Sequence, residues 1–394
     1  MSLILVANPG SASRKYALFD GANQRIASLH FEIVEQEIRC TLTDRDGTSQ
    51  VLAMDFHEIG ESASHVQEIL RVYRLIEDHE IIDAIGIRIV APSKYFLQHR
   101  IVTDETINKL KELSQITPLH IAAALYELEF LKKHFPSATI AAVSDSAFHI
   151  TKPSYAWNYG IDIHDADTYD IKRFGFHGLS VEGSLDALRN AQKMTPKIIV
   201  CHLGSGSSVT AVFNGKSIDT TMGFTPLEGI IMATRSGTID ASAVHVLQAR
   251  TGMDDAAVEK YLYTKGGLLG LGGSNDIRKL IERENRGDHL AHLALSTLVH
   301  SIHKAIGQML VTLDGADMLV FTGTVGERSA ILRKRIVSHL QFTDFILDGS
   351  ANENCLNPTE LTIVSQKAKS KPIIVIPANE GLQIAKAVRT LVGK

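Results

Sequence analysis

The sequence predicts an α/β protein of two domains, and three observations support this fold class. A strand–turn–strand pattern near the N-terminus returns in the second half of the chain. Short apolar runs typical of buried strands alternate with segments whose apolar residues have helical spacing. The length of 394 residues exceeds what one hydrophobic core usually fills, so two domains are expected.

The first strand–turn–strand pattern covers residues 6–21. An apolar run at 3–7 enters a turn of small residues, and an alternating run leaves it. The backbone N–H groups and two hydroxyls of the turn suit an anion such as a phosphate, although most turns of this composition bind nothing. The turn contains Pro9, Gly10, Ser11, Ala12 and Ser13.

The same pattern recurs at residues 200–216. Shifted by 194 positions, residues 6–21 match the second copy at seven of 16 positions without a gap. A repeat spaced by half the chain indicates two similar domains, each with a phosphate-sized turn. Two such turns facing each other across a cleft would grip the phosphates of a nucleotide from both sides.

Composition excludes several classes of protein. With 44% hydrophobic and 21% charged residues, the chain has the composition of an ordinary globular protein. A net charge of -4 offers no basic surface for nucleic acid. The cysteines are odd in number and far apart in the sequence, at Cys40, Cys201 and Cys355, so they imply neither a disulfide framework nor a zinc site. A reduced cytoplasmic compartment is therefore expected. Neither a signal peptide nor a membrane span is expected, since no apolar run is long enough.

In the first half, two charged residues stand out against their surroundings. Arg88 lies in an apolar strand, so it either pairs structurally or points into a site. Asp145 ends another strand, where open α/β sheets place ligand-binding groups. We expect strands within residues 25–54 and at 84–90 and 139–143, and helices at about 62–78, 104–113 and 119–134.

In the second half, His177 and Arg235 are candidates. His177 lies between glycines at a predicted strand-to-helix turn, which would expose its ring, although a histidine there is usually structural.

Residues 323–329, after a strand, can seat a nucleotide phosphate at a helix start. We expect irregular structure at 152–173, helices at about 180–191, 254–263, 276–284, 288–313 and 381–391, strands at 318–322 and 372–376, and a flexible glycine-dense loop at 266–273.

Collinear motifs from residue 3 to 385 resemble those of one family. Residues 8–15 (NPGSASRK) are similar to N-x-G-S-S-S-x-K, and residues 222–237 are almost unchanged from M-G-F-T-P-L-E-G-x-x-M-x-T-R-S-G. The other similar segments are 86–90, 118–120, 145–149, 174–178, 202–207, 276–278 and 377–380. Together they resemble the acetate kinase family of the actin-like ATPase, sugar kinase and heat-shock ATPase superfamily.

The resemblance implies two ribonuclease-H-like domains with the active site in a cleft between them. The first domain would cover residues 1–146 plus 381–394, and the second, with the nucleotide site, residues 147–380. The implied reaction is reversible, direct in-line transfer of the ATP γ-phosphoryl group to acetate or propionate. It also implies Mg²⁺, or Mn²⁺ in its place, with ATP/ADP as co-substrate, and a homodimer.

The chemistry explains the residues that the resemblance selects. A carboxylate is already a nucleophile, so the protein must mainly position two anions and neutralise the transferring phosphoryl group. Arginine suits both tasks. The implied catalytic residues are Arg88, His120, Asp145, His177 and Arg235, and Asn8 and Glu380 would bind the metal. Arg88, Val90, Leu119, Phe176 and Pro226 would bind the acid. The nucleotide would be held by Ser11, Ser13, Lys15, His202, Leu203, Gly204, Ser205, Gly206, Asp276, Ile277, Arg278, Thr324, Val325, Gly326, Glu327 and Arg328.

The chain also departs from the family pattern around these residues. The altered positions are 87–93, Ile121, Leu179, Val181, Ser205 and Thr238. They leave two alternatives to an acetate or propionate kinase. One is a nucleotide-binding regulatory or interaction protein with little transfer activity. The other is a kinase that uses another acid, or pyrophosphate as donor.

Overall fold

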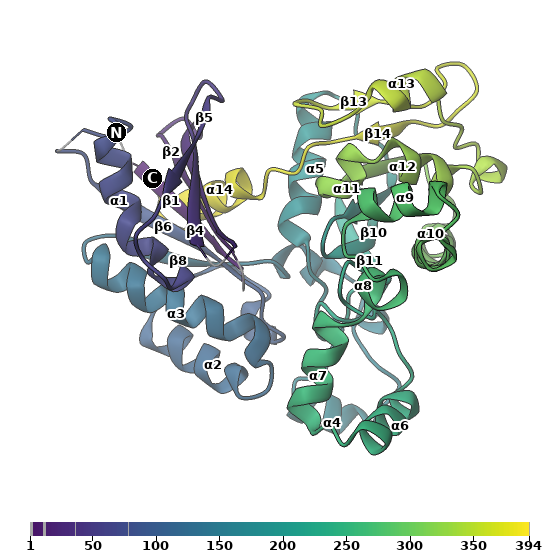
Figure 1. The fold of residues 1–394 in the computed structure, drawn as a ribbon, viewed down its shortest axis with the longest axis horizontal. Helices are drawn as coiled ribbons and strands as arrows, with labels where there is room; N and C mark the ends of the chain where they lie inside the picture. Colours follow the sequence, from purple (N-terminus) through teal and green to yellow (C-terminus); the bar gives the residue numbers. More distant parts are fainter. Residues whose placement is uncertain (1–2, 11–12, 36, 78, 394) are drawn as a thin grey trace. The chain divides into compact units, whose positions relative to one another are not determined.

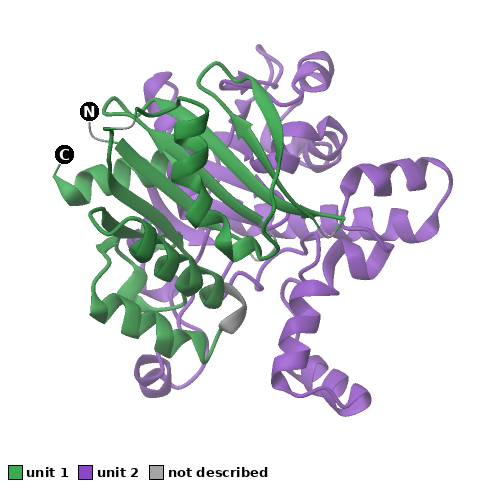
Figure 2. Ribbon diagram, turned by 60° about the vertical axis from the view of Figure 1, so that its left-hand side comes forward, with its two compact units in different colours: residues 1–147, 379–394 green, residues 148–378 purple. Residues whose placement is uncertain are grey.

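The chain forms two compact units (Figure 2). The computed structural model describes residues 3–10, 13–35, 37–77 and 79–393, apart from the side chains of residues 118–120. One unit comprises Met1–Ala147 with Asn379–Lys394, and the other Phe148–Ala378. The chain therefore crosses from one unit to the other twice, at residues 147–148 and 378–379.

The first unit contains a mixed sheet that is centred on β1 (Figure 1). Strand β1 pairs antiparallel with β2 and parallel with β6, which in turn pairs parallel with β8. The order of the described strands is β5-β4-β3-β2-β1-β6-β8-β7. Their bounds are β1 Leu3–Pro9, β2 Ser13–Phe19, β3 Arg25–Val34, β4 Glu37–Thr43, β5 Ser49–Ala53, β6 Ile82–Ile89, β7 Arg100–Ile101 and β8 Thr139–Ser144.

The second unit repeats this arrangement around β9. Strand β9 pairs antiparallel with β10 and parallel with β12, which pairs parallel with β14. The described order is β11-β10-β9-β12-β14-β13. The bounds are β9 Lys197–Leu203, β10 Ser207–Phe213, β11 Lys216–Thr220, β12 Met318–Thr322, β13 Thr362–Ile363 and β14 Ile373–Val375.

The sequence repeat corresponds to these central strands. Both bounds of β1 and β9, and both bounds of β2 and β10, differ by 194 positions. Because β1 and β9 lie inside their sheets, they read as continuous buried apolar runs rather than alternating ones. The predicted pair of strand–turn–strand patterns and the α/β fold class are confirmed.

In the first unit, the C-terminal helix packs on the sheet formed by the N-terminal residues. Gly86 of β6 makes this possible, since a Cβ built there would lie 2.5 Å from Ile384 Cγ2 and 2.6 Å from Val388 Cγ2. The predicted helix at 62–78 ends at Val72, because Arg74 takes a φ of 56°. The helices are α1 Ser62–Val72, α2 Asp104–Ser114, α3 Pro118–His134 and α14 Glu380–Val392, with 3₁₀ turns at Ile59–Glu61 and Lys94–Phe96.

In the second unit, the expected flexible loop at 266–273 is wrong. This segment forms helix α8, whose Gly267 (φ 58°) would place a Cβ only 2.1 Å from Met232 O. The glycines thus allow close backbone packing rather than mobility. Helices α4, α6, α12 and α13 were also not expected from the sequence. The helices are α4 Ile163–Thr168, α5 Gly178–Asn190, α6 Ala241–Thr251, α7 Asp255–Thr264, α8 Gly267–Gly272, α9 Ile277–Asn285, α10 His289–Thr312, α11 Gly323–Arg328, α12 Ala330–Val337 and α13 Gly349–Asn354.

Short 3₁₀ turns complete the second unit, at Ala147–Thr151, Ser154–Ala156 and Gln341–Thr343. Among the described residues, none of the helices combines the length and the apolar character that crossing a membrane requires.

Candidate active site

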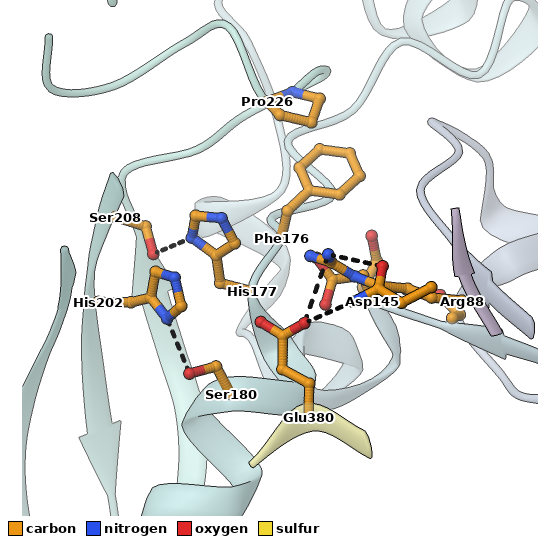
Figure 3. Close-up of polar contacts among 12 residues, drawn as sticks. Arg88, Asp145, Phe176, His177, Ser180, His202, Ser208, Pro226 and Glu380 are labelled. Atoms are coloured by element: carbon orange, nitrogen blue, oxygen red, sulfur yellow. Dashed lines mark hydrogen bonds and ion pairs between the residues drawn. The ribbon is translucent and has the colours of Figure 1, made fainter. Parts of the chain in front are cut away.

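In the first unit, Arg88 is the centre of a polar cluster (Figure 3). Its Nη2 lies 2.9 Å from Asp145 Oδ2, and its Nη1 lies 3.4 Å from Glu380 Oε2. Arg88 Nη1 also donates to Asn8 Oδ1 at 3.4 Å, and Asn8 Nδ2 donates to Glu380 Oε2 at 3.3 Å. The structure therefore brings together four of the predicted site residues in one unit.

The sheet order explains why these four meet. Asn8 lies on β1, Arg88 on β6, and Asp145 directly after β8, so three neighbouring parallel strands end at the same edge. Glu380 is the first residue of α14, which packs on β6. Arg88, the charged residue predicted in an apolar strand, is thus paired with acidic groups. It also lies at the carboxyl ends of the strands, where ligand-binding groups of such sheets are found.

The surroundings of Arg88 keep it charged. Burial lowers the pKa of its guanidinium, but the charges of Asp145 and Glu380 raise it more, so the pKa lies above its ordinary value. Asp145 is fully buried. A cation held in this way can accept a further anion without losing its proton.

The predicted phosphate turn of the first unit is braced by buried charges. Gly10 N donates to Ser13 O at 2.9 Å, and Arg14 Nη1 donates to Gly10 O and Ser13 O. Lys15 is exposed on β2. Ser13 is described, whereas Ser11 lies outside the described residues.

In the second unit, His177 is buried, so the expected exposed ring is wrong. It takes a φ of 62° as the N-cap residue of α5, and no strand precedes it. Its ring stacks on that of His202, with centroids 4.1 Å apart, and its Nδ1 lies 3.0 Å from Ser208 Oγ. Packing against these neighbours removes the ring from solvent.

His177 and Arg235 converge beside the phosphate turn of β9 and β10. A Cβ built on Gly206 would lie 3.2 Å from both His177 Nε2 and Arg235 Nη1. Arg235 Nη1 donates to Pro226 O at 3.2 Å. The turn closes through Gly204 N donating to Gly206 O at 3.0 Å, which leaves Ser205 exposed at its tip.

The predicted adenosine residues belong to two short segments of the second unit. Asp276 caps α9 by accepting from Arg278 N, and a side-chain hydrogen bond from Arg278 holds the pKa of Asp276 below its usual value. In α11, burial raises the pKa of Glu327, whose Oε1 accepts from Ala378 N at 2.9 Å. A narrow, mainly apolar cavity joins these segments to the turn, lined by residues that include Gly204, Ile277 and Val325.

The predicted acid-pocket residues are only partly described. Phe176 and Pro226 are buried in the second unit, and Val90 is half-buried in the first. Leu119 and His120 lie in the first turn of α3, but their side chains lie outside the described residues.

The departures from the family pattern have local structural roles. Ser93 Oγ caps a 3₁₀ turn by accepting from Tyr95 N, and Thr238 Oγ1 accepts from Gly229 N at 3.1 Å. Ile121, Leu179 and Val181 are buried apolar side chains. These substitutions are packed into the fold rather than left as gaps.

Ser180 and Ser208 were not among the site residues predicted from the sequence. They hold the Nδ1 atoms of His202 and His177, at 2.7 Å and 3.0 Å respectively. Small hydroxyl residues are common in glycine turns and helix starts, so their type gave no signal. Only the strand register, which pairs Ser208 with His202, could have drawn attention to one of them.

Comparison with known proteins gives one consistent result. Residues 3–386 match the model of the acetokinase family. The chain is 36% identical over 396 residues to an acetate kinase of Lachnoclostridium phytofermentans, covering 99% of this chain and all of that protein. A propionate kinase from Francisella tularensis superposes with a TM-score of 0.90 at 34% identity, covering 99% of this chain and 100% of that chain. Porphyromonas gingivalis acetate kinase superposes with a TM-score of 0.87 at 30% identity, over the full length of both chains. The chain belongs to the acetokinase family.

Proposed function

We propose that the protein is a carboxylate kinase that transfers the ATP γ-phosphoryl group to acetate or propionate, giving an acyl phosphate and ADP. The observation that carries this proposal is the convergence of His177 Nε2 and Arg235 Nη1 beside Gly206. Two nitrogen donors beside a glycine turn suit the charged oxygens of a phosphoryl group in transfer. Relatives named acetate and propionate kinase disfavour the alternative of a regulator without transfer activity.

In this proposal, the site residues position the acid and the nucleotide and neutralise charge on the transferring phosphoryl group. Arg88 and Arg235 bind the carboxylate and the phosphoryl group, and His177 donates to an equatorial phosphoryl oxygen. Asp145 orients Arg88 through the 2.9 Å ion pair. His120 is a second donor. The acid's apolar end is bound by Val90, Leu119, Phe176 and Pro226; the phosphates by Ser11, Ser13, Lys15 and residues 202–206; and adenosine by residues 276–278 and 324–328.

The oxygen ligands on the chain fit a magnesium ion that arrives with the nucleotide. Among the described residues, no group of three or more histidine, cysteine or acidic side chains is arranged to hold a metal. Asn8 and Glu380, whose Nδ2 and Oε2 atoms lie 3.3 Å apart, each carry side-chain oxygen. Mg²⁺ commonly needs only one or two such ligands besides water and phosphate oxygens. When bound, it would neutralise phosphate charge, and chelating it should abolish product formation.

The test is acyl phosphate formation, trapped as hydroxamate, from MgATP with acetate, propionate and butyrate. Arg88→Ala and Arg235→Ala should each lower kcat/KM by about 10³–10⁵, the range for arginines that stabilise phosphoryl transfer. Arg39→Ala, which removes a 42% exposed arginine on β4, is the matched control and should leave the rate unchanged. Absence of product from every acid with the wild-type protein would refute the proposal.

We also propose a homodimer through the second unit. Helix α6 supports it, because none of its residues is buried and Val246 is 59% exposed. A helix with exposed apolar side chains is stabilised when a second copy covers it. Light scattering should give twice the chain mass for the wild type and a lower mass for Val246→Glu. A monomeric wild type at micromolar concentration would contradict this assembly.

A further inference from the structure

Helix α5 and the β9–β10 ribbon hold each other through two reciprocal serine–histidine pairs (Figure 3). The helix start supplies His177, the N-cap residue of α5, and Ser180 in the first turn. The ribbon supplies His202 and Ser208, which are direct cross-strand partners. Ser208 Oγ lies 3.0 Å from His177 Nδ1, and Ser180 Oγ lies 2.7 Å from His202 Nδ1.

All four side chains are buried, and the two imidazole rings stack at an interplanar angle of 29°. Among the described residues, the imidazole nitrogen is the one hydrogen-bond partner of each serine hydroxyl. A buried hydroxyl without a partner is costly. Each serine is therefore committed to its histidine.

This commitment selects a tautomer. A serine hydroxyl whose one partner is Nδ1 can satisfy its own proton only by donating to that nitrogen, and a neutral imidazole that accepts at Nδ1 carries its ring proton on Nε2. In His177, Nε2 is the atom that lies beside Gly206 together with Arg235 Nη1. A ring proton on Nε2 would thus face the place where the proposed reaction needs a donor.

We propose that Ser208 is a positioning residue that holds His177 as the Nε2–H tautomer toward the transferring phosphoryl group, with the Ser180–His202 pair fixing the stacked partner ring. The inference rests on the proposed function for the identity of the group that His177 contacts. It adds two residues to the site, neither of which was among the predicted site residues. It also links His177 to the phosphate turn, because its stacking partner His202 is the next-to-last residue of β9, directly before that turn.

The kinetic test compares Ser208→Ala, Ser180→Ala and the double variant by hydroxamate trapping. Ser208→Ala should lower kcat about 10–100-fold, by analogy with the loss when a residue that orients a metal-binding histidine is removed, with KM for the acid little changed. The double variant should lose less than the product of the single losses, because the pairs act as one unit. Multiplicative losses, or a kcat unchanged in Ser208→Ala, would overturn the proposal.

Two variants control for simple destabilisation. Thr210→Val removes another buried hydroxyl from the same face of β10, where Thr210 Oγ1 lies 2.9 Å from Thr220 Oγ1, and should leave kcat unchanged. Ser208→Cys nearly keeps the side-chain volume with a weaker donor, and it should also lower kcat. If Ser208→Ala does not fold, Ser208→Cys takes its place in the kinetic comparison.

A spectroscopic readout separates this inference from the proposed function. With ¹⁵N-labelled histidine, the wild-type His177 ring should show a protonated Nε2 and an unprotonated Nδ1, and Ser208→Ala should show a mixture of tautomers. A single unchanged tautomer in Ser208→Ala would refute the inference. Failure of the wild type to form any acyl phosphate would refute the proposed function, and the tautomer result would still stand.

Discussion

At the scale of single residues, Glu127 shows how a buried charge can support a turn that is distant in sequence. It is fully buried on α3, and its carboxylate accepts from Arg14 Nε at 3.1 Å and from Tyr16 Oη at 2.6 Å. The same Arg14 donates to the carbonyl groups of the turn at residues 10–13. The carboxylate therefore fixes the arginine that shapes the proposed phosphate turn.

Replacing this carboxylate should be costly. Glu127→Gln leaves the Arg14 guanidinium buried without a counter-charge, so we expect the free energy of unfolding to fall by about 3–5 kcal/mol. Urea denaturation followed by circular dichroism measures this loss. Glu112→Gln is the control, because its 2.8 Å pair with Lys109 on α2 is exposed and should contribute less than about 1 kcal/mol. Equal effects of the two changes would contradict the structure.

The sequence predicted Arg88 but not this network, and the difference has a physical basis. A charge in an apolar strand is visible locally, because burial demands a partner. Arg14 lies 113 positions from Glu127, and only the packing of α3 against the first sheet brings them together. The same holds for the two serine–histidine pairs, whose partners come from separate elements.

At the scale of elements, glycines have two opposite roles. Gly86 on β6 lets α14 approach the sheet, whereas Gly307 within α10 has open space where a Cβ would be. Glycine is therefore required by packing at the first position, while at the second it only weakens the helix.

These roles predict substitutions of opposite sign. Gly86→Ala forces apart α14 and β6 and should destabilise the protein by about 1–3 kcal/mol. Gly307→Ala should stabilise it by about 0.5–1 kcal/mol, since a glycine inside a helix is disfavoured by that amount. Thermal unfolding of both variants beside the wild type measures the two shifts. A stabilising Gly86→Ala would mean that α14 does not pack on β6 as described.

The glycine-dense segment at 266–273 shows that composition alone does not predict whether glycines give mobility or close packing. Composition alone favoured a flexible loop, but tertiary packing made it helix α8. Alternating and apolar patterns, in contrast, located strands such as β8 and β12 to within about one residue, because burial acts directly on the pattern.

At the scale of the whole molecule, the two units differ in how the chain builds them. Phe148–Ala378 is one continuous stretch, whereas the other unit needs both ends of the chain. The fully buried Ile384, Ala385 and Val388 belong to α14, and Gly86 of β6 meets two of them.

This difference predicts how fragments behave. A fragment of residues 148–378 should unfold cooperatively on its own, because its core is complete. A fragment of residues 1–147 should not, since the face covered by α14 would be exposed, and fusing residues 379–394 to it through a flexible linker should restore cooperative unfolding. Circular dichroism against urea decides both cases. A stably folded fragment of residues 1–147 would show that α14 is dispensable.

The two crossings of the chain also set an order of events during synthesis. The ribosome makes the first 147 residues early, but their unit stays unfinished until the last helix emerges. At typical rates of synthesis, the intervening residues take on the order of tens of seconds to appear. During that interval the exposed sheet face is a target for chaperones, and a nascent chain that stalls near its end would carry a finished second unit beside an incomplete first one.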